Sequence, residues 1–183
     1  RRRLVVDAFI GLHDTMVADR KLIARFDPRA LLLAALDWWT CRMADEILVD
    51  TAAHARYFAR TFGAPIGRFR VVPLEPRTDV FRPAPPREND GTFRVLFYGT
   101  FIPLQGVEHI LDAAALLAKQ HPSVRFDLVG AGQTRSAMER RARELGIGNL
   151  AFHPPVPIER IAAFLRASDC CLGIFGTTAK ADR

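Results

Sequence analysis

Residues 93–106 read Phe93-Arg-Val-Leu-Phe-Tyr-Gly99-Thr-Phe-Ile-Pro-Leu-Gln-Gly106. The first six form a short apolar run typical of a buried strand, and a glycine bounds each end of the loop that follows. A helix is expected after the second glycine, because Val107, Ile110 and Leu111 begin a series of apolar residues at helical spacing. A helix N-terminus beside such a loop binds phosphate through free N–H groups and the positive end of the helix dipole. We therefore expect an anionic, phosphate-bearing ligand here.

The alternation of strand and helix continues to the end of the chain. Apolar runs predict three further strands, at 124–129, 150–153 and 169–175. Between them, Ser136 precedes Glu139 by three residues, the spacing of a capping box, and Gly146 is expected to end that helix. Pro157 begins the next helix.

The first part of the chain alternates in the same way. Apolar runs predict strands at 4–10, 44–50 and 68–74. Pro28 fits the first turn of a helix that ends near Met43, and Asp50 or Thr51 caps a second helix over 52–62. Alternating strands and helices predict an α/β fold with parallel sheets covered on both faces.

Between these parts lies a stretch rich in proline and charge, residues 76–92. Such a composition is too polar to pack and is typical of a linker. We therefore predict two domains, 1–75 and 93–183, on either side of it. In the second, the loops at 99–106, 130–133, 153–157 and 176–183 should converge at the carboxyl edge of one sheet, where such sheets bind ligands.

Composition narrows the classes of partner. The 183 residues carry a formal net charge of +6, which suits a phosphorylated ligand or an anionic membrane, but the arginines form no run interleaved with aromatics, so nucleic acid is not expected. The three cysteines lack metal-ligand spacing and are interpreted as buried thiols of a cytoplasmic protein. Trp38 and Trp39 fit a core or interdomain contact better than an anchor at a membrane surface. Peripheral contact with the cytoplasmic membrane face stays open.

The order of these parts resembles the retaining GT-B glycosyltransferases of family 4, also called group 1. The resemblance spans roughly residues 44–176 and rests on order and spacing. It is carried by the linker residues 80–83, the loop from Gly99 to Gly106, the pair Gly130 and Gly132, the stretch 151–156 and residues 167–169. It implies two Rossmann-like domains, with the acceptor in the first and a nucleotide-diphosphate sugar in the second.

The resemblance also implies donor-binding residues in the second domain. Those that match are Gly99, Thr100, Gln105, Gly106, Gly130, Gly132, Gln133 and Val156. The family has Arg and Lys where this chain has Thr100 and Gln105, so its loop lacks two charges that hold the diphosphate. Lys180 and Arg183, beyond the last predicted strand, are our candidates to replace them; a solvated basic loop is an equal alternative.

In the first domain, His13 and Asp14 are the candidate catalytic residues. By resemblance, His13 is expected to orient the acceptor or to stabilise the departing phosphate. Asp14, which is adjacent in sequence, is a candidate to polarise the imidazole or to bind an acceptor hydroxyl. A histidine that only caps a turn is the alternative. The family needs no metal and no cofactor, since the nucleotide sugar is a substrate.

Two further expectations concern the extent and the activity of the chain. We interpret it as a fragment truncated at both ends, with both domains incomplete. It should be inactive by itself, because the family's E-x7-E segment is expected to lie beyond its last strand. The resemblance implies sugar transfer with retention to a glycan or lipid-linked acceptor. A non-catalytic nucleotide-sugar-binding subunit and a GT-B-type nucleotide-sugar epimerase are the alternatives.

Overall fold

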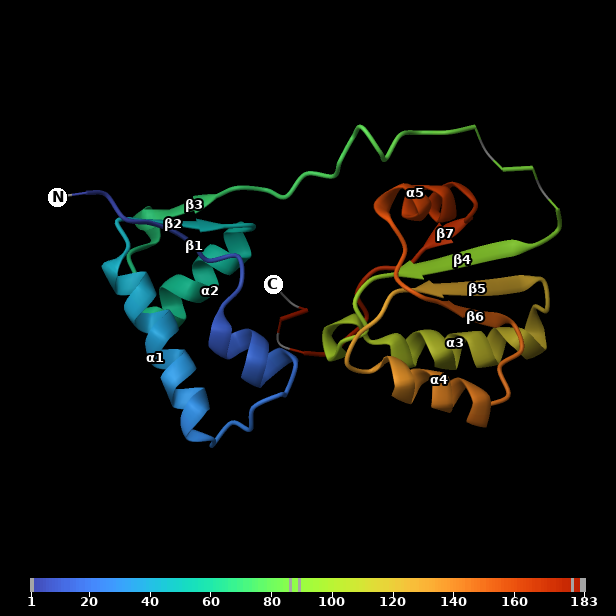
Figure 1. Cartoon of the computed structure of the whole chain (residues 1–183), viewed down its shortest axis with the longest axis horizontal. Helices are drawn as coiled ribbons and strands as arrows, with labels where there is room; N and C mark the ends of the chain where they lie inside the picture. Colours follow the sequence, from blue (N-terminus) through green and yellow to red (C-terminus); the bar gives the residue numbers. More distant parts are fainter. Residues whose placement is uncertain (1, 86, 89, 179, 182–183) are drawn as a thin grey trace. The chain divides into compact units, whose positions relative to one another are not determined.

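The computed structural model describes residues 2–85, 87–88, 90–178 and 180–181. Its internal contacts divide the chain into two compact units (Figure 1). The first unit comprises residues 1–75 and 178–183, and the second comprises residues 76–177. Each unit is an α/β structure with its own parallel sheet, as predicted.

The first unit has a three-stranded parallel sheet in the order β1-β2-β3. Its elements are β1 (Val5–Asp7), η1 (Asp14–Asp19), α1 (Pro28–Met43), β2 (Glu46–Val49), α2 (Ala52–Phe62), η2 (Ile66–Arg68) and β3 (Phe69–Val71). The core joins the fully buried Ile47 and Val49 of β2 to Phe58 and Phe62 of α2. The short π-helix η1 had no counterpart in the sequence prediction.

The two predicted helices of this unit start where their capping residues require. The Asp27 carboxylate accepts a hydrogen bond from the backbone N–H of Arg29, and Pro28 takes the first helical position of α1. The Thr51 hydroxyl accepts from the backbone N–H of His54 at 3.0 Å. Gly63, in the left-handed conformation at φ 66°, ends α2. The predicted bounds of both helices are confirmed.

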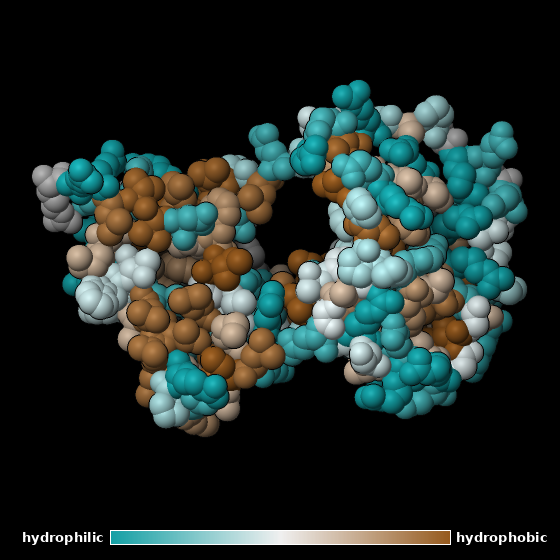
Figure 2. All heavy atoms as spheres, in the orientation of Figure 1, coloured by the Kyte–Doolittle hydropathy of each residue, from teal (hydrophilic) through white to brown (hydrophobic). Residues whose placement is uncertain are grey.

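The large side chains of α1 are turned outward, contrary to the interpretation of its tryptophans as core residues. Trp38 and Trp39 are 48% and 59% exposed, and Leu31 is 72% exposed. Figure 2 shows apolar side chains gathered over this helix. The buried residues of α1 are instead Ala30, Asp37 and Cys41. The core assignment is therefore wrong within the described residues, while a contact of the tryptophans with another domain remains a prediction.

The second unit has a four-stranded parallel sheet in the order β6-β5-β4-β7. Its elements are β4 (Phe93–Tyr98), η3 (Pro103–Gln105), α3 (Val107–Gln120), β5 (Val124–Val129), α4 (Arg135–Glu144), β6 (Leu150–His153), α5 (Ile158–Arg166) and β7 (Cys170–Cys171). The strands predicted at 93–98, 124–129 and 150–153 have the predicted bounds. The last strand is shorter than predicted, because after Leu172 the backbone turns to bond the loop that follows β4.

Successive residues of the central strands face opposite layers of this unit. Phe97 and Leu128 are buried in a cluster with α3 and α4, whereas Leu96 and Val129 are buried in a cluster with α5. Figure 1 shows α3 and α4 on one face of the sheet and α5 on the other. The predicted cover on both faces is therefore confirmed for this sheet. Phe81 of the linker packs on the α5 side.

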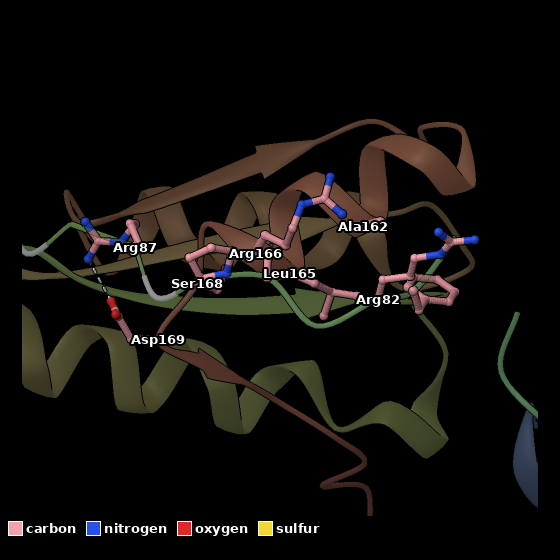
Figure 3. A pocket seen from close by; sticks show the side chains of 10 residues that line it. Arg82, Arg87, Ala162, Leu165, Arg166, Ser168 and Asp169 are labelled. Atoms are coloured by element: carbon pink, nitrogen blue, oxygen red, sulfur yellow. Dashed lines mark hydrogen bonds and ion pairs between the residues drawn. The ribbon is translucent and has the colours of Figure 1, made fainter. Parts of the chain in front are cut away.

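The linker is tied to the rest of the second unit by an ion pair. Arg87 donates to the Asp169 carboxylate at 3.0 Å (Figure 3). The backbone N–H of Arg94, in β4, donates to the same oxygen at 2.8 Å. These two donors, Arg94 first, hold the pKa of Asp169 below its usual range. A groove of about 570 Å³ lies between the linker and α5, with Arg82 and Arg166 at its sides.

Two local predictions were wrong. Ser136 lies inside α4 and not at its cap, because the helix begins at Arg135 and Glu139 pairs with Arg135 at 2.7 Å. Cys171 is exposed and Cys170 half-buried, so only Cys41 is a buried thiol as expected. The two adjacent cysteines lie on β7, a short strand at the edge of the sheet.

Candidate functional site

The strand order of the second unit creates a switch point between β4 and β7. The strands β5 and β6 lie on one side of β4, whereas β7 lies on the other. The chain passes from β4 to β5 on one side and reaches β7 on the other, and sheets of this kind bind ligands at the carboxyl ends of the strands where the order reverses. The loop Gly99–Gly106 follows β4, and Gly176 follows β7. The loop with which the sequence prediction began thus lies at the ligand edge of this sheet.

Glycines allow this loop to touch its neighbours through backbone alone. A Cβ on Gly130 would overlap the carbonyl oxygen of Gly99, and one on Gly132 would lie 2.5 Å from the carbonyl oxygen of Phe101. On the other side, a Cβ on Gly106 would lie 2.5 Å from the backbone nitrogen of Gly176. Gly106 also has a φ of 61°, which side chains disfavour. These glycines are required by packing between loops.

Backbone hydrogen bonds connect the four predicted loops. Phe101 N–H donates to Ala131, Gly130 N–H donates to His153, and Gly176 N–H donates to Leu104, at 2.9, 3.1 and 3.0 Å. The structure therefore brings together the loops after β4, β5, β6 and β7. All of these contacts lie within the second unit.

The remaining predicted donor residues have different surroundings. Thr100 and Gln133 are exposed, and Gln105 is half-buried with its amide next to Gly99. Val156 packs against the cluster of Leu96, Val129 and Ile161, so its side chain is part of the core on the α5 side. No contact tests their role in donor binding, which stays a prediction.

Arg135 joins these loops by its side chain, and the sequence analysis missed it. Its guanidinium donates to the carbonyl oxygens of Gly130 and of His153, the latter at 2.6 Å. It also lies over the rings of Phe101 and Phe152, at 5.6 and 5.7 Å from their centroids. Its position directly after the Gly130–Gln133 loop was the available signal, but its partners come from three different strand ends.

Lys180 lies in the first unit. Its ammonium donates to the hydroxyl of Thr15 at 3.3 Å, and the hydroxyl of Thr178 donates to the Asp19 carboxylate at 3.4 Å. Arg183, the other candidate to replace the missing loop charges, is outside the described residues. The donor-binding role of both residues therefore stays a prediction.

In the first unit, His13 lies in the connection between β1 and η1, which we call the His13 loop; the backbone of Leu12 and His13 is already helical there, and His13 is the N-cap of η1. This segment is held on both sides of His13. Before it, the backbone N–H groups of Leu12 and His13 donate to the carboxylate of Asp37 at 3.0 and 2.9 Å. After it, the buried Asp14 carboxylate accepts from the hydroxyl of Tyr57 at 3.4 Å. His13 itself is partly exposed. The candidate catalytic residues are thus adjacent in sequence, with His13 partly exposed and Asp14 buried.

Asp37, which holds the backbone beside His13, is the second supporting residue that the sequence analysis did not single out. It interrupts the apolar run of α1, and it is buried beside Cys41. Burial, and after it the negative charge of Asp37, raises the pKa of the Cys41 thiol to about 11. The available signal was a carboxylate within an apolar helix, whose partners lie 24 and 25 residues away in sequence.

Two features are absent from the described residues, a metal site and a helix that could span a membrane. Within that part of the chain, no group of three or more His, Cys, Asp or Glu side chains could hold a metal ion. None of the described helices is both long enough and apolar enough to span a bilayer.

Two parallel-sheet units joined by a linker, with a glycine-bounded loop at the switch point of the second, define the GT-B fold of glycosyltransferases. Residues 81–172 match the family model of the glycosyl transferases group 1. The chain belongs to this family. The resemblance inferred from the sequence is thereby confirmed.

Individual relatives agree with this assignment. The D-inositol 3-phosphate glycosyltransferase of Acidothermus cellulolyticus is 36% identical in an alignment of 143 residues that covers 68% of this chain and 32% of the relative. Among solved structures, WaaG, a glycosyltransferase involved in lipopolysaccharide biosynthesis, matches 94% of the chain with a TM-score of 0.70 at 20% identity, over 53% of its own length. Anabaena Alr3699/HepE in complex with UDP-glucose matches 94% with a TM-score of 0.67 at 20% identity, over 47% of its length. The chain spans about a third of the length of the curated relatives it matches.

Proposed function

We propose that the whole protein containing this chain transfers a sugar from a nucleotide-diphosphate sugar to a glycan or lipid-linked acceptor, with retention of configuration. The donor binds at the carboxyl edge of β4 and β7, and the acceptor binds at the His13 loop. In the reaction the bond from the anomeric carbon to the diphosphate breaks, and a bond to an acceptor hydroxyl oxygen forms. The hydroxyl proton leaves with the diphosphate.

One observation carries this proposal: the loop Gly99–Gly106 lies at a switch point and leads into the N-terminus of α3. Gly106 caps α3 without a side-chain hydrogen bond, which leaves N–H groups of the first turn for an anionic ligand. Family membership supports a sugar nucleotide as that ligand. The solved structure of Alr3699/HepE contains UDP-glucose, which makes this compound the first donor to test.

The charge on the departing diphosphate needs compensation, which Thr100 and Gln105 do not supply. Removing one donor of this kind typically lowers the rate about 100-fold. Arg135 brings a guanidinium to the loops after β5 and β6, although it is shared with the carboxylate of Glu139. We propose that Arg135 orders the donor loops, and that Lys180 and Arg183 add positive charge when the donor binds.

A test of the latter residues is a donor titration of the whole protein carrying Lys180→Ala and Arg183→Ala. Weaker binding of UDP-glucose by about tenfold, with little change for Lys119→Ala on the last turn of α3, is the expected result. Unchanged affinity would remove both residues from the donor site.

We propose further that His13 orients the acceptor hydroxyl or stabilises the leaving diphosphate. The partial exposure of His13, on a backbone held by Asp37 and flanked by the buried Asp14, supports this role. Asp14 is buried and accepts from Tyr57, which supports a role in fixing the loop beside any contact with the acceptor.

Two other functions would use the same site. A subunit that binds a nucleotide sugar without transferring it is favoured by the neutral residues Thr100 and Gln105. An epimerase of GT-B type would convert the nucleotide sugar into its epimer without an acceptor. Both are distinguished from transfer by the products.

The experiment that tests the proposal incubates the whole protein with a panel of nucleotide sugars, with and without acceptors. Release of nucleoside diphosphate that depends on an acceptor is expected, with D-inositol 3-phosphate included because several relatives carry that substrate in their names. Binding without turnover would support the subunit, and acceptor-independent conversion would support the epimerase.

For a lipid-linked acceptor, we propose peripheral contact with the cytoplasmic membrane face through the exposed side of α1. Trp38 and Trp39 are exposed there, and the guanidinium of Arg42 lies 5.4 Å from the Trp38 ring. Aromatic and cationic side chains together suit an anionic bilayer surface. Sedimentation with anionic vesicles, compared between the wild-type whole protein and its Trp38→Ser, Trp39→Ser variant, tests this contact.

A further inference from the structure

The Asp37 carboxylate is buried and holds the backbone of the loop that carries His13. Its Oδ1 accepts from the N–H of Leu12 at 3.0 Å, and its Oδ2 accepts from the N–H of His13 at 2.9 Å. Asp37 is 7% exposed, a degree of burial that aspartate tolerates only with partners. The two N–H groups provide such partners, and hydrogen bonds to an ionised oxygen are stronger than neutral ones.

The same loop is anchored again on either side of these bonds. Gly11 packs so closely on α2 that a Cβ there would lie 3.1 Å from the ring of Phe58. Asp14 is 3% exposed and accepts from the hydroxyl of Tyr57. His13 therefore lies between two anchored residues, Gly11 and Asp14. Among the anchors described here, Asp37 is the one that bonds the backbone of His13 itself.

We propose that Asp37 is a positioning residue for sugar transfer, which fixes the backbone of Leu12 and His13 and so aims the imidazole at the reacting groups. This inference rests on the proposed function, in which His13 acts on the acceptor or on the leaving diphosphate. Asp37 comes from α1, a separate element, so it sets the loop against the body of the unit.

The chemistry of the carboxylate explains why an amide should not replace it. Two N–H donors point at two oxygens, and asparagine offers one oxygen and one NH2 group. In Asp37→Asn one loop N–H would face another donor, and the loop would have to shift. A misplacement of about 1 Å at a reacting group can lower the rate about 100-fold.

A purely structural role for Asp37 predicts a different outcome from a positioning role. Loss of stability alone would lower the fraction of folded protein and would act equally with and without His13. Cys41→Ala is the matched control, since Cys41 is buried on α1 one turn from Asp37 and bonds no part of the loop.

The experiment measures donor KM and kcat for the whole protein as wild type, Asp37→Asn, His13→Ala, the double variant and Cys41→Ala. We expect Asp37→Asn to lower kcat about 100-fold with donor KM within about twofold, and Cys41→Ala to leave both within about twofold. In the His13→Ala background, Asp37→Asn should add less than about threefold, because the two residues act as a unit. An equal loss in both backgrounds, or an unchanged kcat in Asp37→Asn, would overturn the inference.

A second measurement separates this inference from the proposed function. Amide hydrogen exchange of Leu12 and His13 should be slow in the wild type and at least about tenfold faster in Asp37→Asn, with other amides of α1 and α2 unchanged. Unchanged exchange of these two amides would show that Asp37 does not hold the loop. If the wild type transfers no sugar from any donor, the proposed function fails, while amide exchange still decides whether Asp37 fixes the backbone.

Discussion

The loop Gly99–Gly106 and the segment Gly11–Asp14, which leads into η1, are held in place by opposite means. The first has glycines of three loops at its contacts, and its backbone lies directly against other backbone. The second is held by a buried carboxylate from another helix, which bonds the N–H groups of Leu12 and His13. A loop that must approach other backbone requires the absence of side chains, whereas a loop that must aim one side chain requires a specific partner.

The two units nevertheless share one hydrogen-bond arrangement at the start of their sheets. In each, an aspartate immediately before a strand accepts the N–H at the start of the neighbouring strand. Asp45 accepts from Leu4 at 2.9 Å in the first unit, and Asp169 accepts from Arg94 at 2.8 Å in the second. The difference between the units therefore lies in their loops and not in how their sheets begin.

The largest effect is expected at the contact between the loops after β4 and β5. Gly130→Ala should lower the free energy of unfolding by more than about 3 kcal/mol, because the new Cβ would overlap the Gly99 carbonyl and φ there is 145°. Gly148→Ala, with nothing within 4 Å and no positive φ, should change it by less than about 0.5 kcal/mol. Urea unfolding of both variants measures the difference. Equal stability of the two would show that glycine is not needed for this contact.

A smaller effect is expected where a side chain supports the glycine contacts. Arg135→Met should raise the donor KM about tenfold, because the carbonyl oxygens of Gly130 and His153 lose a charged donor. Arg140→Met on the same helix should change the donor KM by less than about twofold, because Arg140 is exposed and its contact with Glu144 is long, at 3.9 Å. Steady-state kinetics of the whole protein check both. A donor KM that Arg135→Met leaves unchanged would show that backbone packing alone orders these loops.

The smallest effect is expected in the pH dependence of stability, through the buried thiol of Cys41 on α1. The pKa of Cys41 is about 11 against an ordinary 9.0, so the folded state keeps its proton when the unfolded state has lost it. The contribution of Cys41 to stability is therefore present below pH 9 and is lost as the pH rises toward 11. The urea midpoint of the wild type should fall more steeply across this window than that of Cys41→Ala. Parallel curves would indicate that water reaches the thiol.

Most of the fold followed from the sequence because its signals are local. Apolar runs located the strands at 93–98, 124–129 and 150–153, and capping residues located α1 and α2. The exposed apolar face of α1 was predicted to be buried. Burial of a helix face depends on which other elements pack against it, and the leucines of α1 alone do not reveal those elements. The π-helix η1 was not predicted, because its buried residues include Asp14, Thr15 and Asp19, and polar residues of these types usually lie on protein surfaces.

The loops of the candidate site could be predicted from the sequence, but the side chains that hold these loops in place could not. Glycines at strand ends mark close approaches, so Gly99, Gly106, Gly130 and Gly132 could be found from the sequence, although their packing on one another could not. Asp37 and Arg135 act on partners that only the folded chain brings near. Their residue types carry no local signal for these contacts, since exposed aspartates and arginines are common on helices.

The central claim, sugar transfer with retention, is tested most directly by the stereochemistry of the product. The whole protein is incubated with an α-linked nucleotide sugar, beginning with UDP-glucose, and with the acceptor that turns over. The anomeric proton coupling of the first product is then read by NMR. A small coupling, from an α-glycosidic product, is predicted. A large coupling from a β-linked product, or no transfer with any donor of the panel, would contradict it.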